Sequence, residues 1–124
     1  MNRDVVLLDS QHARIFRIGT QTAPEAMRFS HPDHHTHAKD QGDSESHRFY
    51  SEVAKHLLDA DELLVLGHGM AKAHFKTYLQ QHHAGLAKKV VGYETVNNPT
   101  DGQLAAFAAQ YFHRVEAVRA VRGE

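Results

Sequence analysis

The sequence predicts an α/β fold with three layers, in which a mixed and mostly parallel sheet lies between helices. Short apolar runs typical of buried strands recur along the chain, and segments with helical periodicity separate the later runs. The first two runs are separated by a short turn alone. Strands that alternate with helices form parallel sheets with right-handed crossovers, whereas two strands joined by a short turn form an antiparallel hairpin. The 124 residues fit one domain, which we expect to span residues 1–124.

The chain begins with a predicted hairpin and an edge strand. Residues 5–8, Val-Val-Leu-Leu, have the composition of a buried strand, and residues 9–12 supply turn-forming side chains. Residues 13–18 alternate between apolar and polar side chains, which predicts the second strand of the hairpin. Residues 25–29 predict a third strand at the edge of the sheet.

The stretch 30–47 has neither helical nor strand periodicity, and it is rich in histidine. We expect a long loop here, and such loops are often functional or disordered. Asp43 or Ser46 can then cap a first helix. Its apolar side chains recur every four positions, at Phe49, Val53 and Leu57.

The second half of the chain begins with a buried strand at residues 63–66, followed by Gly67, His68 and Gly69. A helix with apolar side chains on one face follows, and Gly85 is its expected end. The apolar positions of this helix are Ala71, Phe75 and Leu79.

The last strand and helix complete the predicted topology. A strand runs from Val90 to about Thr95, and Thr100 with Gln103 forms a capping box for the final helix. The apolar stripe of that helix consists of Leu104, Ala108, Tyr111, Val115 and Val118. Three strands followed by helix, strand, helix, strand and helix is the element order of a ribonuclease H-like, three-layer fold.

Composition excludes several classes of function. The chain has no cysteine, which excludes disulfides, thiolate metal sites and cysteine nucleophiles and fits a reducing cytoplasm. No apolar run approaches the ~20 residues that span a bilayer, and no signal peptide is expected, so we predict a cytoplasmic protein without a membrane partner. Net charge is −1 with its twelve histidines neutral, so no overall basic field points to nucleic acid.

Four segments resemble the middle domain of archaeal and eukaryotic class-one release factors and of the related Pelota proteins. Residues 63–75 are similar to the family's strand followed by Gly-Pro-Gly, two residues, Lys, two residues and Phe, with His68 in place of the proline. Segments 5–9 and 13–16 are similar to the family's first hairpin, and residues 89–92, Lys-Val-Val-Gly, resemble a late strand. The resemblance covers most of the chain in the right order, and it extends to bacterial proteins called translational machinery proteins.

This resemblance implies a fold shared with several ribosomal proteins and a ribosomal or RNA partner. Hydrolysis of peptidyl-tRNA in the family depends on a Gly-Gly-Gln tripeptide in the loop before the first helix. Here residues 31–47 contain the single glycine Gly42, so no residue inherits the catalytic role. We therefore expect a non-catalytic module, not an enzyme, that acts in translation or its control. The sequence leaves its oligomeric state open.

The strand-to-helix turn with its two glycines is the candidate nucleic-acid site. Backbone N–H groups at the start of a helix can bind an anion such as phosphate, and lysines nearby can neutralise it. The glycines are equally suited to a tight turn, and the lysines to a solvated face. The candidate residues are Gly67, Gly69, Lys72, Lys76, Lys88 and Lys89.

The histidine-rich loop supports an alternative function, metal binding. Imidazoles bind zinc or nickel, and ligands this close in sequence need little loop closure. The spacing matches none of the standard zinc patterns, and a solvated spacer explains it as well. The candidate metal ligands are His31, His34, His35 and His37.

A metal-dependent nuclease is the third alternative, because that chemistry needs carboxylates that converge on two metal ions. Asp9 ends the first strand and Glu52 lies on the first helix, but the strand 63–66 ends in glycine. We interpret the arginines of the final helix, Arg114, Arg119 and Arg122, as a solvated face.

Overall fold

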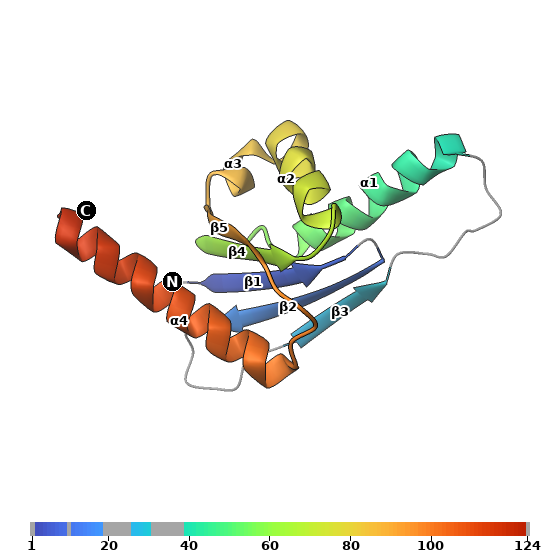
Figure 1. The fold of residues 1–124 in the computed structure, drawn as a ribbon. Coiled ribbons are helices and arrows are strands. Elements are labelled where there is room, and N and C mark those ends of the chain that lie inside the picture. The colour runs from blue at the N-terminus through green and yellow to red at the C-terminus, as the bar shows by residue number, and fades with distance from the viewer. Residues whose placement is uncertain (1, 10, 19–25, 31–38, 124) are drawn as a thin grey trace.

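The computed structural model describes residues 2–9, 11–18, 26–30 and 39–123, with the backbone alone at 26–30 and 39–46. Five strands form one sheet in the order β3-β2-β1-β4-β5 (Figure 1). β1 pairs antiparallel with β2, β2 pairs antiparallel with β3, and β4 pairs parallel with both β1 and β5. Four of the five strands therefore run in one direction. Their bounds are Arg3–Leu8 (β1), His12–Ile18 (β2), Ala26–Ser30 (β3), Glu62–Gly67 (β4) and Val90–Thr95 (β5).

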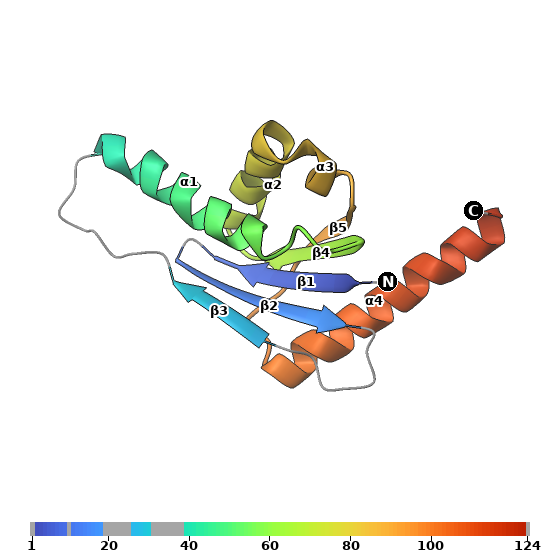
Figure 2. The ribbon, with the colours of Figure 1, turned by 180° about the vertical axis from the view of Figure 1, so that it is seen from behind.

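Helices cover both faces of this sheet, which confirms the three-layer, ribonuclease H-like prediction. α1 (Lys39–Lys55), α2 (Ala71–His82) and the short α3 (Ala84–Ala87) lie on one face, and α4 (Asp101–Arg122) lies on the other (Figures 1 and 2). The right-handed connection from one parallel strand to the next requires the intervening helices to share a face. No helix in the described ranges is long and apolar enough to cross a membrane.

The alternation of side chains along the central strands produces two cores. In β4, Leu63 and Val65 pack with α1 and α2, whereas Leu64 and Leu66 pack with α4. All four side chains are fully buried, as expected for a parallel strand covered on both faces. The continuous apolar run in the sequence therefore has a direct structural cause.

The β1–β2 hairpin closes through Asp9, as the sequence predicted. Its carboxylate accepts hydrogen bonds from the backbone N–H groups of Gln11 and His12, each at 2.7 Å, and its own N–H donates to the His12 carbonyl at 2.9 Å. Partial burial alone would raise the pKa of Asp9, but the two N–H donors and His12 outweigh it and lower the pKa below 3.8. The carboxylate is thus committed to the turn.

The first helix begins earlier than the sequence predicted. α1 starts at Lys39, so residues 39–47 are helical and do not belong to a loop spanning 30–47, and Ser30 ends β3. The apolar periodicity marks the part of a helix that meets the core, whereas propagation of backbone hydrogen bonds extends it beyond that part. In Figure 1 the first turns of α1 lie away from the sheet and its last turns lie over it.

The second helix also ends differently from the prediction. α2 ends at His82, and His83 has a non-helical backbone with φ −142° and ψ 60°. A separate short helix, α3, follows, and Gly85 lies inside it. The sequence contains no proline at this point, so nothing local marked the break.

The final helix begins with the predicted capping box, in which the Thr100 side chain accepts from the Gln103 N–H and the Gln103 side chain accepts from the Thr100 N–H. Leu104, Ala108 and Phe112 are its buried residues. The C-terminal part of α4 extends past the sheet (Figure 1). Val118, near the C-terminal end of α4, is 48% exposed. The predicted apolar stripe is thus buried at Leu104 and Ala108, half-buried at Tyr111 and Val115, and exposed at Val118.

Candidate nucleic-acid interface

The β4–α2 turn has the geometry that its two glycines predict. A Cβ atom at Gly67 would lie 2.5 Å from the Leu8 carbonyl oxygen, so close approach of β1 to β4 requires glycine here. Gly69 has φ +68°, in the left-handed region that glycine adopts without strain. Met70, the N-cap residue of α2, forms no side-chain capping hydrogen bond. These observations account for both glycines by backbone geometry, and anion binding at this turn stays a prediction.

Lys72 and Lys76 both lie against the edge strand β5. The ammonium of Lys72 donates a hydrogen bond to the Thr95 hydroxyl at 2.6 Å. The ammonium of Lys76 lies 5.1 Å from the centre of the Tyr93 ring, within the range of a cation–π contact. α2 therefore places both charges along the C-terminal half of β5.

Lys88 and Lys89 lie at the opposite end of the same strand, immediately before Val90. The Lys89 carbonyl accepts from the Leu63 N–H at 3.0 Å, which holds this backbone against β4. Both side chains are exposed. β5 has six residues and is about 20 Å long at about 3.3 Å per residue, so the four lysines do not form one compact patch. Lys72 and Lys76 lie beside this edge strand, and Lys88 and Lys89 directly precede it; we call these four residues the β5 lysine row.

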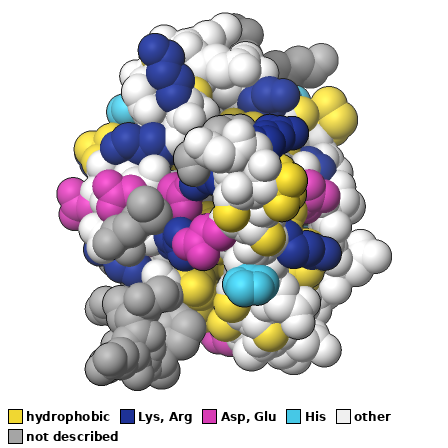
Figure 3. Space-filling model, turned by 90° about the vertical axis from the view of Figure 1, so that its left-hand side faces the viewer, with side chains coloured by type: hydrophobic (Ala, Val, Ile, Leu, Met, Phe, Trp, Pro, Cys, Tyr) yellow, Lys and Arg dark blue, Asp and Glu magenta, His cyan; other side chains and the backbone are white. Residues whose placement is uncertain are grey.

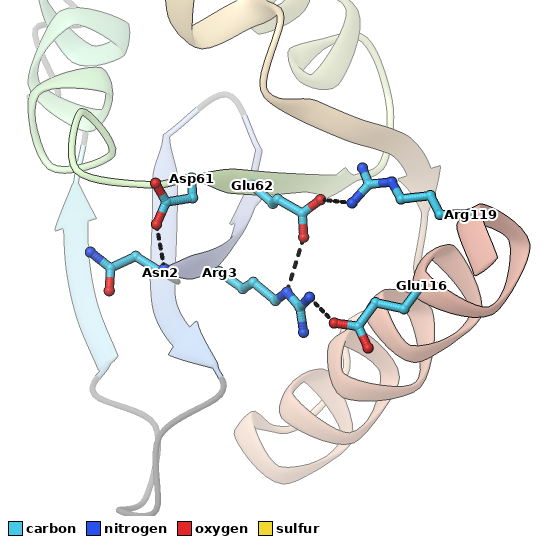
Figure 4. Close-up of polar contacts among 6 residues, drawn as sticks. All are labelled: Asn2, Arg3, Asp61, Glu62, Glu116 and Arg119. Carbon is cyan, nitrogen blue, oxygen red and sulfur yellow. Dashed lines mark hydrogen bonds and ion pairs between the residues drawn. The ribbon is translucent and has the colours of Figure 1, made fainter. Parts of the chain in front are cut away.

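A buried carboxylate joins α4 to the N-terminal ends of β1 and β4 (Figure 4). Glu62 is 6% exposed and accepts from Arg3 at 2.9 Å and from Arg119. Arg3 also donates to Glu116, one turn before Arg119 on α4, and its guanidinium lies 5.7 Å from the Phe112 ring centre. Arg119 is therefore an ion-paired residue in this cluster, which differs from the solvated face predicted for it.

Sequence reasoning missed a groove between α4 and the start of β5. It has a volume of about 580 Å³, and Lys88 and Lys89 line it together with Arg114, Arg119 and Arg122. Figure 3 looks at this end of the molecule, where dark-blue cations lie among magenta carboxylates and yellow apolar side chains. The signal in the sequence was the continuation of the apolar stripe of α4 together with basic residues. A one-dimensional pattern does not tell whether a sheet lies under that stripe.

Two other candidate sites were predicted, the histidines of the metal site and the carboxylates of a nuclease. His31, His34, His35 and His37 lie outside the described residues, so zinc or nickel binding there stays a prediction. In the part of the chain that the structure describes, no three His, Asp or Glu side chains converge as metal ligands. Of the two carboxylates named for a nuclease, Asp9 is bound to its own turn, and Glu52 lies 3.7 Å from the ammonium of Lys55 on α1.

Three of the solved structures with a similar fold are archaeal proteins. Pelota from Archaeoglobus fulgidus matches 98% of this chain with a TM-score of 0.63 and 17% identity, and Pelota from Thermoplasma acidophilum matches 87% with 0.65 and 18%. The archaeal translation termination factor aRF1 matches 98% with a TM-score of 0.65 and 16% identity. This chain spans 37%, 32% and 40% of those proteins, respectively. No family model matches the chain, and a search of curated proteins finds no significant relative.

Proposed function

We propose that this chain is a non-catalytic module that binds the ribosome or RNA in translation or its control. The observation that carries the proposal is the likeness in fold to Pelota and to the translation termination factor aRF1, over 98% of this chain in two cases. A shared fold is compatible with many functions, so the surface has to supply the chemistry.

The β5 lysine row supplies chemistry that suits a phosphate backbone. Two of its ammonium groups lie beside the C-terminal half of β5 and two belong to residues directly before this strand of about 20 Å, so a polyanion that follows β5 would meet positive charge at both of its ends. Lys88 and Lys89 have no side-chain partner within the described ranges, so they are available without breaking an internal contact. The hydroxyl and the aromatic ring that contact Lys72 and Lys76 are neutral and leave both charges unneutralised.

Two charge-reversal variants test this surface: Lys72→Glu with Lys76→Glu, and Lys88→Glu with Lys89→Glu. We expect each to reduce co-sedimentation of the tagged protein with ribosomal particles in a sucrose gradient. Binding of a labelled oligouridylate should also become less salt-dependent. The slope of log K against log salt should fall by about 1.4 for two lost phosphate contacts on a single strand.

The matched control reverses two charges elsewhere, Arg48→Glu with Lys55→Glu on α1. Both side chains are exposed and lie on an element that does not border β5. The control has the same net charge as either test variant, so a general charge effect would weaken binding equally in all three variants. Equally weakened binding in all three variants would contradict the proposed surface. Unchanged binding in both test variants, with unchanged circular dichroism spectra, would also contradict it.

A further inference from the structure

The groove between α4 and the start of β5, which we call the α4 groove, has a regular apolar lining. α4 contributes Tyr111, Val115 and Val118, whose spacing of four and three residues places them on one face of the helix. β5 contributes Val90 and Val91 from the other side. Four valines thus line a groove of about 580 Å³ at the surface.

The charge of the groove is predominantly positive. Two carboxylates face five cations there, and both carboxylates already have internal partners. Asp61 accepts from the backbone N–H of Asn2 at 2.6 Å, and Glu62 is shared between Arg3 and Arg119. Lys88 and Lys89 remain for a ligand on one wall, and Arg114, whose guanidinium lies 5.9 Å from the Tyr111 ring centre, remains on the other.

We propose that the α4 groove binds an acidic segment of another protein that carries aliphatic side chains among its carboxylates. The valines would take the aliphatic side chains, and the basic walls would pair with the carboxylates. The apolar surface continues outward at Val118, which is 48% exposed. This site differs from the β5 lysine row because its apolar lining and three of its cations belong to the groove alone.

The side chains at the groove favour a peptide over RNA. Single-stranded RNA is held by bases that stack on free aromatic faces. The aromatic residue of this groove, Tyr111, is stacked on Phe107 with 6.2 Å between ring centres, and its hydroxyl is 3.1 Å from the Glu94 carboxylate. Burial and that carboxylate raise the pKa of Tyr111, so it stays a neutral donor to Glu94 at neutral pH. The four valines of the groove give aliphatic side chains an apolar surface, which a phosphate backbone does not use.

Fluorescence anisotropy with labelled twelve-residue peptides tests the proposal on the full chain. A peptide of alternating Asp and Leu should bind with a Kd of about 10 µM. Peptides of alternating Asp and Ser, or of Lys and Leu, should bind at least about ten-fold more weakly, because each lacks one of the two features. Val118→Asp should weaken binding of the Asp-Leu peptide about ten-fold, since it places a carboxylate within the apolar lining.

The matched control is Val121→Asp, which adds the same charge three residues away on α4. Val121 is 89% exposed and does not line the groove, so this variant should bind the peptide as the unmodified protein does. The double variant Lys72→Glu with Lys76→Glu should also bind the peptide normally, although its binding of oligouridylate is weakened. Failure of this proposal can therefore be distinguished from failure of the proposed function.

Three results would overturn the inference. Equal loss of peptide binding in the Val118 and Val121 variants would show a general charge effect. Tighter binding of oligouridylate than of the Asp-Leu peptide, lost on Val118→Asp, would assign the groove to RNA. Dimerisation in analytical ultracentrifugation that Val118→Asp abolishes would assign it to a second copy of this chain.

Discussion

At the scale of single residues, two glycines of similar appearance in the sequence have opposite structural roles. Gly67 ends β4, where an added Cβ would lie 2.5 Å from a backbone oxygen of the neighbouring strand. Gly85 lies in the short helix α3, where an added Cβ would meet no atom within 4 Å. Only the first position uses the small size of glycine.

We therefore expect Gly67→Ala to destabilise the fold by about 1–3 kcal/mol, because the backbone of β1 or β4 has to shift. Gly85→Ala is the matched control and should stabilise by up to about 1 kcal/mol, since alanine favours a helix and restricts the unfolded chain. Urea unfolding followed by circular dichroism measures both changes. Equal stability of the two variants would contradict the close approach of β1 and β4.

At the scale of elements, α4 is held by packing over its first half and by ion pairs beyond it. Leu104, Ala108 and Phe112 pack on the sheet, and α4 then extends past the sheet. Two ion pairs connect this extension to the sheet. Glu116 pairs with Arg3 of β1, 113 residues away in sequence, and Arg119 pairs with Glu62 of β4, 57 residues away. The wall of the α4 groove thus depends on a long-range polar contact.

Removal of the buried carboxylate, Glu62, should lower the stability of the fold more than removal of the exposed one, Glu116. We expect Glu62→Ala to destabilise by about 1–3 kcal/mol. This is less than for a fully buried pair, because Arg3 and Arg119 can be rehydrated. Glu116→Ala should cost less than about 1 kcal/mol, since Glu116 is 48% exposed and its ion pair is screened by solvent. Thermal and urea unfolding compare the two, and a larger cost for Glu116 would contradict the central position of Glu62.

At the scale of the whole molecule, the sheet brings together residues that support two separate interaction surfaces. The β5 lysine row lies along one edge, and the α4 groove lies at the end where β5 begins. Both include Lys88 and Lys89, so a ligand at one surface would compete with a ligand at the other for these two charges. The alternative function, metal binding, depends on a different set of residues, His31, His34, His35 and His37.

Zinc titration distinguishes that alternative. We expect weak binding spread over several sites, because the spacing of these histidines matches no standard zinc pattern and nothing in the sequence pre-orients their rings. Changing His31, His34, His35 and His37 together to alanine should then leave calorimetric titrations nearly unchanged. A one-to-one complex of micromolar affinity that this variant abolishes would contradict the expectation. Such a complex should weaken as pH falls through about 6.5, since ligating imidazoles must be neutral.

Much of the fold follows from local patterns in the sequence. The hairpin turn at Asp9, the capping box of Thr100 and Gln103, and the glycine turn after β4 each depend on a few adjacent residues. Their hydrogen bonds and backbone angles need no distant partner. The continuous apolar run of β4 likewise predicted a strand buried on both faces. The sequence by itself therefore determined the element order, the strand types and the fold class.

The tertiary structure alone decided where these elements end and which surfaces they make together. Periodicity identified the apolar face of α4, but it could not show that Leu104 meets the sheet and Val118 lies in a groove, since that depends on how far the sheet extends. It also could not place Lys72 and Lys89 at opposite ends of one strand. Contacts such as Glu62 with Arg119 join segments 57 residues apart, and chain folding brings such segments together where no sequence pattern connects them.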